Sequence, residues 1–148
     1  MVKALGVYFG HDKKECEHLN WEDKIKSCIN SINNWNKRNL TFFGRITVIK
    51  TLLLSTFTYL FQTCFTPKDI ISRINKIFYG FLWSNKREKI RRTITICLKE
   101  NGGLDMIHLE SFIKAIKTKL IQSLLLNHDS ANWKVIPHFY FDQYGRDF

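Results

Sequence analysis

The chain has few prolines, glycines and acidic residues: 2 Pro, 7 Gly and 13 Asp or Glu among 148 residues. The scarcity of Pro and Gly excludes collagen-like, proline-rich and glycine-rich low-complexity segments. The scarcity of acids against 23 Lys and Arg leaves a formal net charge of +10 at pH 7. Since 45% of the residues are hydrophobic and a chain of this length buries about 68 to 70% of its unfolded surface, we expect a folded, basic, single-domain protein.

Sequence features of secretion and membrane insertion are also missing. The first ten residues lack the apolar run of about 7 to 15 residues that a secretory signal needs. The most apolar stretch, residues 46–61, is interrupted by Lys50 and is shorter than the about 18 residues of a membrane span. The four cysteines form no Cys-x-x-Cys pair, which is typical of free thiols in a reducing compartment. We therefore expect an intracellular protein, nuclear or cytoplasmic, without a membrane partner.

Hydrophobic periodicity predicts a mainly α-helical fold. Three amphipathic helices are expected to form an up-down bundle, followed by a fourth helix. The first helix is predicted for residues 20–38, with Asn20 as its cap, and the second, the innermost and most apolar, for residues 41–64. Thr66 is expected to cap the third helix, with Pro67 as its first residue. The fourth helix is predicted for about residues 108–126. A turn at Asn101-Gly102-Gly103 precedes the fourth helix.

Two short β segments are predicted beside the helices. Residues 3–9 are apolar at nearly every position, which is typical of a strand buried on both faces. The next strand-like run is residues 93–98, far along the chain. A buried strand without a neighbouring partner indicates a piece of something larger. The tail, residues 127–148, is aromatic but has no periodicity and receives no assignment.

The excess positive charge lies in two blocks. No acidic residue occurs between Asp23 and Asp69, and residues 76–99 contain seven basic residues against Glu88. Segregated cations beside aromatic and hydroxyl side chains favour a phosphate backbone as the partner, because Lys and Arg release its counterions and hydroxyls bind its oxygens. A solubilising lysine-rich surface is the alternative.

Small and hydroxyl side chains recur every three or four residues along the predicted helix 41–64. They are Gly44, Thr47, Thr51, Ser55, Thr58 and Gln62. Such a stripe lets a nucleic-acid backbone approach closely, and A-form duplexes offer a wide, shallow minor groove for shape-based contacts. The same stripe would equally suit packing against another helix.

An ordered set of motifs runs along the chain. It comprises Trp35-x-x-Arg38-x-Leu40-Thr41-x-x-Gly44-Arg45, Ile49-Lys50, Tyr59-Leu60, Phe81-Leu82-Trp83 and Gly102-Gly103-Leu104. Together these motifs resemble the segment after the polymerase palm in non-LTR (LINE-like) retrotransposon reverse transcriptases. Leu5-Gly6-Val7 with Gly10 is similar to the last palm strand of that family, and Trp133-Lys134-x-Ile136-Pro137 is similar to its downstream region.

The resemblance implies a thumb and connector that grip the RNA template paired with its DNA primer. It divides the chain into three segments. Residues 1–10 would be a remnant of the last palm strand, and residues 11–84 a helical thumb-like bundle. Residues 85–148 would be a basic connector with a short β segment, a helix and an aromatic tail. The palm and fingers of a reverse transcriptase would be protein partners. The runner-up is a helical protein-interaction module that docks on a partner chain.

The predicted nucleic-acid contacts follow from the resemblance and from the charge blocks. The resemblance implies Lys37, Arg38, Arg45 and Lys50; the stripe adds Thr47 and Thr51, and the basic run adds Lys86, Arg87, Arg91 and Arg92. We expect Arg45 and Lys50 to be surface residues, so that replacing either by alanine changes stability by only about half a kcal/mol. The run 86–92 could also be a nuclear localisation tract. Tyr79 and Trp83 either stack on bases or pack on the connector.

Polymerases of this family need paired palm aspartates to hold two metal ions, and this chain has no Asp-Asp pair. We therefore expect no catalytic residues, metal, cofactor or small-molecule substrate, and no polymerase activity from these residues alone. Two weaker alternatives concern other chemistry. Cys16-Glu17-His18 with Cys28 offers three possible zinc ligands, and Asp105, His108 and Ser111 could form a hydrolase triad. No nucleotide-binding glycine motif is present.

Overall fold

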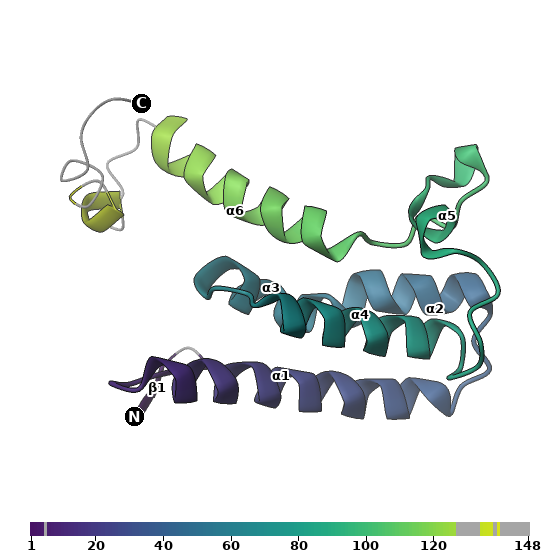
Figure 1. The fold of residues 1–148 in the computed structure, drawn as a ribbon, viewed down its shortest axis with the longest axis horizontal. Coiled ribbons are helices and arrows are strands. Elements are labelled where there is room, and N and C mark those ends of the chain that lie inside the picture. Colours follow the sequence, from purple (N-terminus) through teal and green to yellow (C-terminus); the bar gives the residue numbers. More distant parts are fainter. Residues whose placement is uncertain (5, 127–133, 138, 140–148) are drawn as a thin grey trace.

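A computed structural model describes residues 1–4, 6–126, 134–137 and 139. It confirms the mainly helical fold and has a small antiparallel sheet near the N-terminus (Figure 1). The elements are β1 (Val2–Ala4), β2 (Val7–Phe9), α1 (Lys13–Asn36), α2 (Phe42–Val48), the π-helix η1 (Ile49–Leu53), α3 (Ser55–Thr63), α4 (Lys68–Leu82), α5 (Arg92–Ile96), the 3₁₀-helix η2 (Lys99–Asn101) and α6 (Leu109–Leu126). None of the helices in these residues is long and apolar enough to cross a lipid bilayer.

The helices pack in layers, with α1 on one side and α6 crossing the other (Figure 1). α3 contacts both α1 and α6, so it lies inside the bundle. The α3 side chains Phe57, Leu60 and Phe61 are fully buried, and Trp21 of α1 packs on Phe61 with ring centroids 5.7 Å apart. The inner position predicted for helix 41–64 is therefore confirmed.

The N-terminal residues form a hairpin instead of the single buried strand predicted for residues 3–9. β1 and β2 pair antiparallel with Lys3 opposite Tyr8, and Gly6 in the turn has φ of 79°. Of the described hairpin residues, Val7 alone is buried. The prediction was wrong because glycine adopts a positive φ without steric cost and lets an apolar run fold back on itself. The strand has a local partner, which removes the argument that its sheet is missing.

Helix α1 begins earlier than predicted, and Asn20 is not its cap. Asp12 caps the helix by accepting a hydrogen bond from the Glu15 N–H at 3.1 Å. Inside the helix, the Asn20 side chain accepts from the Tyr8 N–H at 2.7 Å and donates to the Tyr8 carbonyl oxygen at 3.1 Å. Asparagine bonds well to helix termini and to other backbone groups, so its position in the sequence could not distinguish the two uses. Asn20 holds the hairpin against α1.

The helix predicted for residues 41–64 is confirmed, with one irregular turn. Thr41 caps α2, its hydroxyl accepting a backbone hydrogen bond from the first turn at 3.2 Å. The π-helix Ile49–Leu53 then joins α2 to α3. A π-turn inserts an extra residue into the helical repeat and is frequent at functional sites. Here it carries Lys50 and Thr51, two of the predicted contact residues.

The third helix begins later than predicted. α4 starts at Lys68, Pro67 is its cap residue, and Thr66 makes no capping hydrogen bond. The Thr66 hydroxyl is buried and has no hydrogen-bond partner in the described part of the chain. Pro67 has φ of −63° and ψ of 151°, so the chain is still extended at this residue. The extended proline therefore displaces the helix start beyond the reach of the threonine.

The β segment predicted for residues 93–98 is wrong, because these residues contain the one-turn helix α5. Thr95 is buried within it, and the Thr95 N–H donates to the Arg91 carbonyl oxygen at 3.1 Å. Among the described residues, no strand lies beside this segment. Short runs of β-branched residues become strands through packing against partner strands rather than through an intrinsic preference. Without such a partner the segment closes a local helical turn.

The predicted turn at residues 101–103 is confirmed. Gly102 has φ of 74°, in the left-handed region that favours glycine. A Cβ atom at Gly103 would lie only 2.0 Å from the Cys97 carbonyl oxygen, so no larger residue fits there. The turn returns the chain to the hydrophobic core, where Met106 is buried and α6 follows.

Candidate nucleic-acid interface

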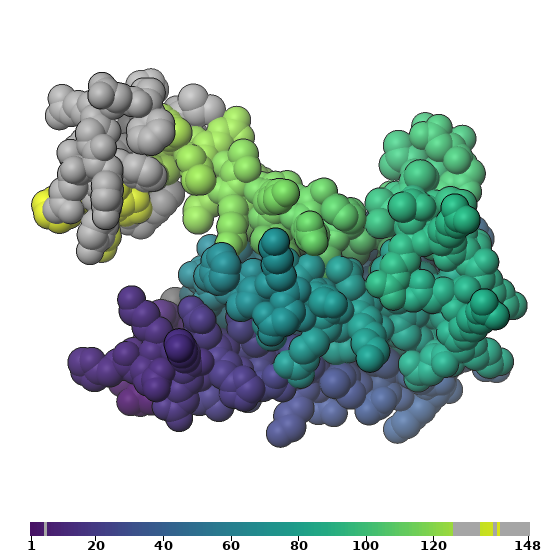
Figure 2. Space-filling view, in the orientation of Figure 1, coloured from purple at the N-terminus to yellow at the C-terminus, as the bar shows by residue number. Residues whose placement is uncertain are grey.

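Positive charges from two distant parts of the sequence meet at one end of the bundle. The C-terminus of α1, the start of α2 and the loop after α4 lie together there, at the right in Figure 1. The teal-to-green segment that follows α4 covers the same end in Figure 2. We call this surface the basic end; its exposed cations are Lys37, Arg38, Lys86, Arg87 and Lys89.

The charge of the basic end is not neutralised by neighbouring carboxylates. Within the described ranges, no ion pair joins any of these cations to an Asp or Glu. Glu88, in the same loop, binds Arg92 instead. The Arg38 guanidinium lies 4.5 Å from the centre of the Trp35 ring, and this cation–π contact leaves its charge intact. The basic end therefore attracts anions.

A hollow of about 270 Å³ opens at this end, between α2 and the loop after α4. Its lining includes Leu40, Phe42, Arg45, Trp83, Lys86, Arg87 and Lys89, and no acidic residue of the described chain. The Phe42 and Trp83 rings are in contact, with centroids 4.8 Å apart and planes tilted by 49°. We call this site the α2–α4 hollow. Cations beside aromatic rings suit a nucleotide, because they bind its phosphate and its base respectively.

Arg45 lies at the edge of the hollow but is bonded within the protein. Its Nη1 donates to the Phe81 carbonyl oxygen at 2.8 Å and to Asn36 Oδ1 at 3.2 Å. Its guanidinium lies 5.1 Å from the centre of the Phe81 ring. The expectation that Arg45 is a surface residue without structural partners is therefore wrong. Arg45 joins α2 to the C-terminal ends of α1 and α4.

Lys50, on the π-helix η1, is paired with an acid. Its Nζ lies 2.6 Å from Asp105 Oδ2 and 3.1 Å from the Asp105 carbonyl oxygen. This hydrogen bond and the positive charge of Lys50 lower the pKa of Asp105. Asp105 has φ of 54°, which is uncommon outside glycine. Lys50 therefore ties the π-turn to the segment before α6, and it is not the unattached surface lysine that the sequence predicts.

The stripe of small and hydroxyl side chains faces outward at its centre. Thr47, Thr51 and Ser55 are exposed, so no described helix packs over these three residues. The hydroxyls of Thr47 and Thr51 donate to carbonyl oxygens one turn earlier, at 3.1 and 2.8 Å. A hollow of about 190 Å³ beside them is also lined by Lys50 and Lys99. Helix packing, the alternative weighed from the sequence, does not occur here within the described residues.

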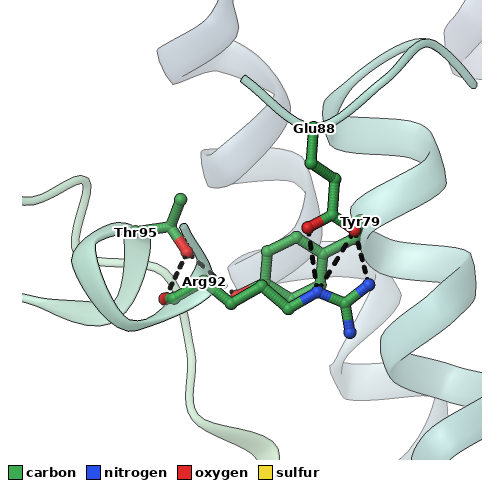
Figure 3. A network of polar contacts seen from close by, with 4 residues as sticks. All are labelled: Tyr79, Glu88, Arg92 and Thr95. Carbon is green, nitrogen blue, oxygen red and sulfur yellow. Dashed lines mark hydrogen bonds and ion pairs between the residues drawn. The ribbon is translucent and has the colours of Figure 1, made fainter. Parts of the chain in front are cut away.

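Arg91 and Arg92 lie beyond the basic end, at the start of α5, and Arg92 belongs to a polar network (Figure 3). The Arg92 Nε donates to Glu88 at 3.0 Å, and its guanidinium lies 4.3 Å from the centre of the Tyr79 ring. The Tyr79 hydroxyl contacts Thr95 Oγ1 at 3.0 Å, and burial raises the pKa of Tyr79. Tyr79 thus packs on the connector rather than offering its ring to a base.

The zinc alternative has no support in the described residues. Cys16 and Cys28 are both buried on α1, more than three helical turns or about 18 Å apart along its axis. Burial raises the pKa of the Cys28 thiol to about 12, which disfavours the thiolate that zinc binds. No group of three or more His, Cys, Asp or Glu in this part of the chain is placed to hold a metal ion.

The triad alternative is only partly assembled. His108 Nδ1 lies 2.7 Å from Ser111 Oγ, at the start of α6. Asp105 binds Lys50 instead, and no hydrogen bond joins Asp105 to His108 in the residues that the structure describes. The arrangement therefore lacks the carboxylate that orients the histidine of a hydrolase.

Phe42 and Lys89 line the hollow but are absent from the predicted contacts. Lys89 belongs to the same basic run as Lys86 and Arg87, and this charge pattern was a sufficient signal. Phe42 had no such signal, because its contact with Trp83 joins residues far apart in the sequence.

The chain is distantly similar to longer proteins. It is 27% identical over 110 residues to a protein of Arabidopsis thaliana whose name describes a ribonuclease H protein, a match that covers 71% of the chain and 18% of that protein. It is 24% identical over 146 residues to a 149 kDa protein of the transposon TX1 from Xenopus laevis, a match that covers 97% of the chain and 11% of that protein. The chain thus spans less than a fifth of the length of either relative. No protein-family model matches it.

Proposed function

We propose that the chain is a nucleic-acid-gripping segment of a retrotransposon-derived protein, with the role that a thumb and connector have in a reverse transcriptase. Its ligand would be the duplex of RNA template and DNA primer. The similarity to a transposon TX1 protein along 97% of the chain supports a transposon-related function. In this proposal the segment has no catalytic residues, and the palm and fingers of the polymerase are its protein partners.

One observation carries the nucleic-acid part of the proposal. Lys37 and Arg38 come from the first charge block, and Lys86, Arg87 and Lys89 come from the second, yet all are exposed around one end of the bundle. None is paired with a carboxylate in the described residues. Folding therefore concentrates charge that the sequence only segregates, and clustered unpaired cations are the electrostatic signature of phosphate binding.

The test measures the affinity of the full chain for an RNA/DNA heteroduplex by fluorescence anisotropy over a salt series. If the five cations of the basic end each neutralise one phosphate, log affinity falls with log salt with a slope of about −4.5. Replacing Lys86 and Arg87 by alanine removes two contacts, so the slope should become shallower by about 2.

Lys13 and Lys14 provide a matched control. They are exposed and lie at the opposite end of the 24-residue helix α1, about 36 Å away along its axis. The double variant K13A/K14A carries the same net charge as K86A/R87A. Equal losses of affinity in the two variants would show that the basic end has no special role, and a heteroduplex affinity independent of salt would reject the proposal.

A helical protein-interaction module is the second candidate, and the surface of α6 favours it. Leu120, Ile121 and Leu125 are exposed to 46%, 50% and 66% on the half of α6 that leads away from the bundle core. Exposed apolar side chains on neighbouring helical turns are typical of a surface that another chain covers. Mutating Leu120 and Ile121 to serine would leave nucleic-acid affinity unchanged and would reduce association with a partner polymerase domain.

A further inference from the structure

We propose that the α2–α4 hollow binds one unpaired nucleotide of a single strand adjoining the duplex. This inference rests on the proposed function, because it assigns the hollow a part of the same nucleic acid. The exposed cations around it would contact the duplex backbone, whereas the hollow itself would take a base that has no pairing partner.

The lining of the hollow places an aromatic surface next to positive charge. Phe42 and Trp83 supply the rings, and Lys86, Arg87 and Lys89 supply the charge. Bases stack on such rings regardless of sequence, and the flanking cations follow the phosphate backbone. A paired base is held inside its duplex, so only an unpaired one can reach a ring within a hollow.

Trp83 also has an unused hydrogen-bond donor. Its indole Nε1 is buried and has no acceptor in the described part of the chain. A buried indole nitrogen usually finds a partner. Because this atom is closed to solvent, it does not open into the hollow, and a base there would be held by the aromatic rings and the cations instead.

The size and charge of the hollow narrow the choice of occupant. Its volume of about 270 Å³ is just below the range of about 300 to 1,000 Å³ typical of sites for drug-sized molecules, which favours a single nucleotide over a dinucleotide cofactor. The absence of acidic residues from its described lining disfavours a cationic or peptide-amine ligand.

The loop that carries the hollow is held in place by backbone bonds. The Trp83 N–H donates to the Tyr79 carbonyl oxygen at 3.0 Å, and the Asn85 N–H donates to the Gly80 carbonyl oxygen at 2.7 Å. Ser84 and Asn85 have φ of 53° and 56°, so the chain turns sharply after Trp83. These contacts fix the indole against Phe42 before a ligand arrives, which reduces the cost of ordering it on binding.

The experiment compares a blunt RNA/DNA heteroduplex with the same duplex carrying a short single-stranded overhang that contains 2-aminopurine. The full chain should bind the overhang duplex at least about five-fold more tightly, the effect of one stacked base. Stacking should also quench the 2-aminopurine fluorescence. Trp83→Leu should abolish both effects, and Trp83→Phe should retain part of them, with the affinity of each variant for the blunt duplex as the reference.

The outcomes separate this inference from the proposed function. Equal affinity for both duplexes, or an overhang preference that Trp83→Leu leaves intact, would overturn the inference while the proposed function stands. Failure to bind either duplex would reject the proposed function itself. If Trp83→Leu lowers the melting temperature below the assay range, Lys89→Glu tests the same site from an exposed position. It should weaken overhang binding more than blunt binding, whereas Lys14→Glu should not.

Discussion

Replacing Arg45 by methionine should destabilise the protein, because this arginine connects three helices. Methionine keeps an apolar stem of similar length and removes the donors that reach the Phe81 carbonyl oxygen and Asn36. The Phe81 carbonyl lies in the last turn of α4, where carbonyl oxygens have no partner within the helix and a positive charge is favourable. The Phe81 carbonyl oxygen keeps the hydrogen bond from the Ser84 N–H at 3.2 Å, but it loses its charged donor, and Asn36 Oδ1 loses the hydrogen bond from Arg45.

The magnitude follows from these contacts. A hydrogen bond to a charged group contributes about 1.5 to 3 kcal/mol to stability. Arg45 is half-buried, and water would replace part of the lost bonding, so we expect a loss of about 2 kcal/mol. In a chain of this size each kcal/mol corresponds to about 2 to 4 °C, which predicts a fall in Tm of about 4 to 8 °C.

Urea unfolding followed by circular dichroism measures this loss, with Arg87→Met as the control. Arg87 is exposed and has no ion pair within the described residues, so its replacement should change stability by no more than about 0.5 kcal/mol. The reasoning would be refuted if Arg45→Met and Arg87→Met had the same stability. Arg45 would then be a surface cation, as the sequence alone predicts.

Two further predictions concern other contacts. Asn20→Ala should lower the free energy of unfolding by about 1 to 3 kcal/mol, because it leaves the part-buried backbone groups of Tyr8 without partners. In hydrogen exchange, the Tyr8 amide should lose protection before the α3 amides do. Lys50 lowers the pKa of Asp105 in the folded protein. Their ion pair therefore stabilises the fold above about pH 3.9, the pKa of an aspartate in the unfolded chain, and this stabilisation is lost as the pH falls through the lower pKa of Asp105 in the folded state. The urea concentration at the midpoint of unfolding should therefore fall less steeply from pH 7 to pH 2 in Asp105→Asn than in the wild type. Asparagine is chosen because it still adopts a positive φ.

Four local structures differ from those that the sequence predicts. Residues 3–9 are mostly apolar and residues 93–98 are mostly β-branched, yet the first run lies in a hairpin and the second contains a helical turn. Asn20 and Thr66 both have the chemistry of a helix cap, yet neither caps a helix. In each case several local structures suit the residues equally well, and their surroundings select one. Gly6 turns the first run back on itself, the extended Pro67 displaces the helix start from Thr66, and the Tyr8 backbone binds Asn20. Residues 93–98 have no partner strand among the described residues.

The candidate site shows the same division. The two charge blocks, and the contact residues Lys37, Arg38, Lys86 and Arg87 within them, are visible in the sequence because charge and exposure depend on residue type. The rings of Phe42 and Trp83 meet only after α2 and α4 pack together, so the hollow between them is a property of the fold.

The sequence by itself determined that the chain is helical, where most of its helices lie and which stretches carry the positive charge. Periodicity and charge are properties of neighbouring residues, so they are present before folding. The tertiary structure decided which cations stay unpaired: Arg45 and Lys50 meet the Phe81 carbonyl and Asp105, whereas Lys86 and Arg87 meet no acid in the described residues. A side chain's partner depends on distance in space, which residue order alone does not specify.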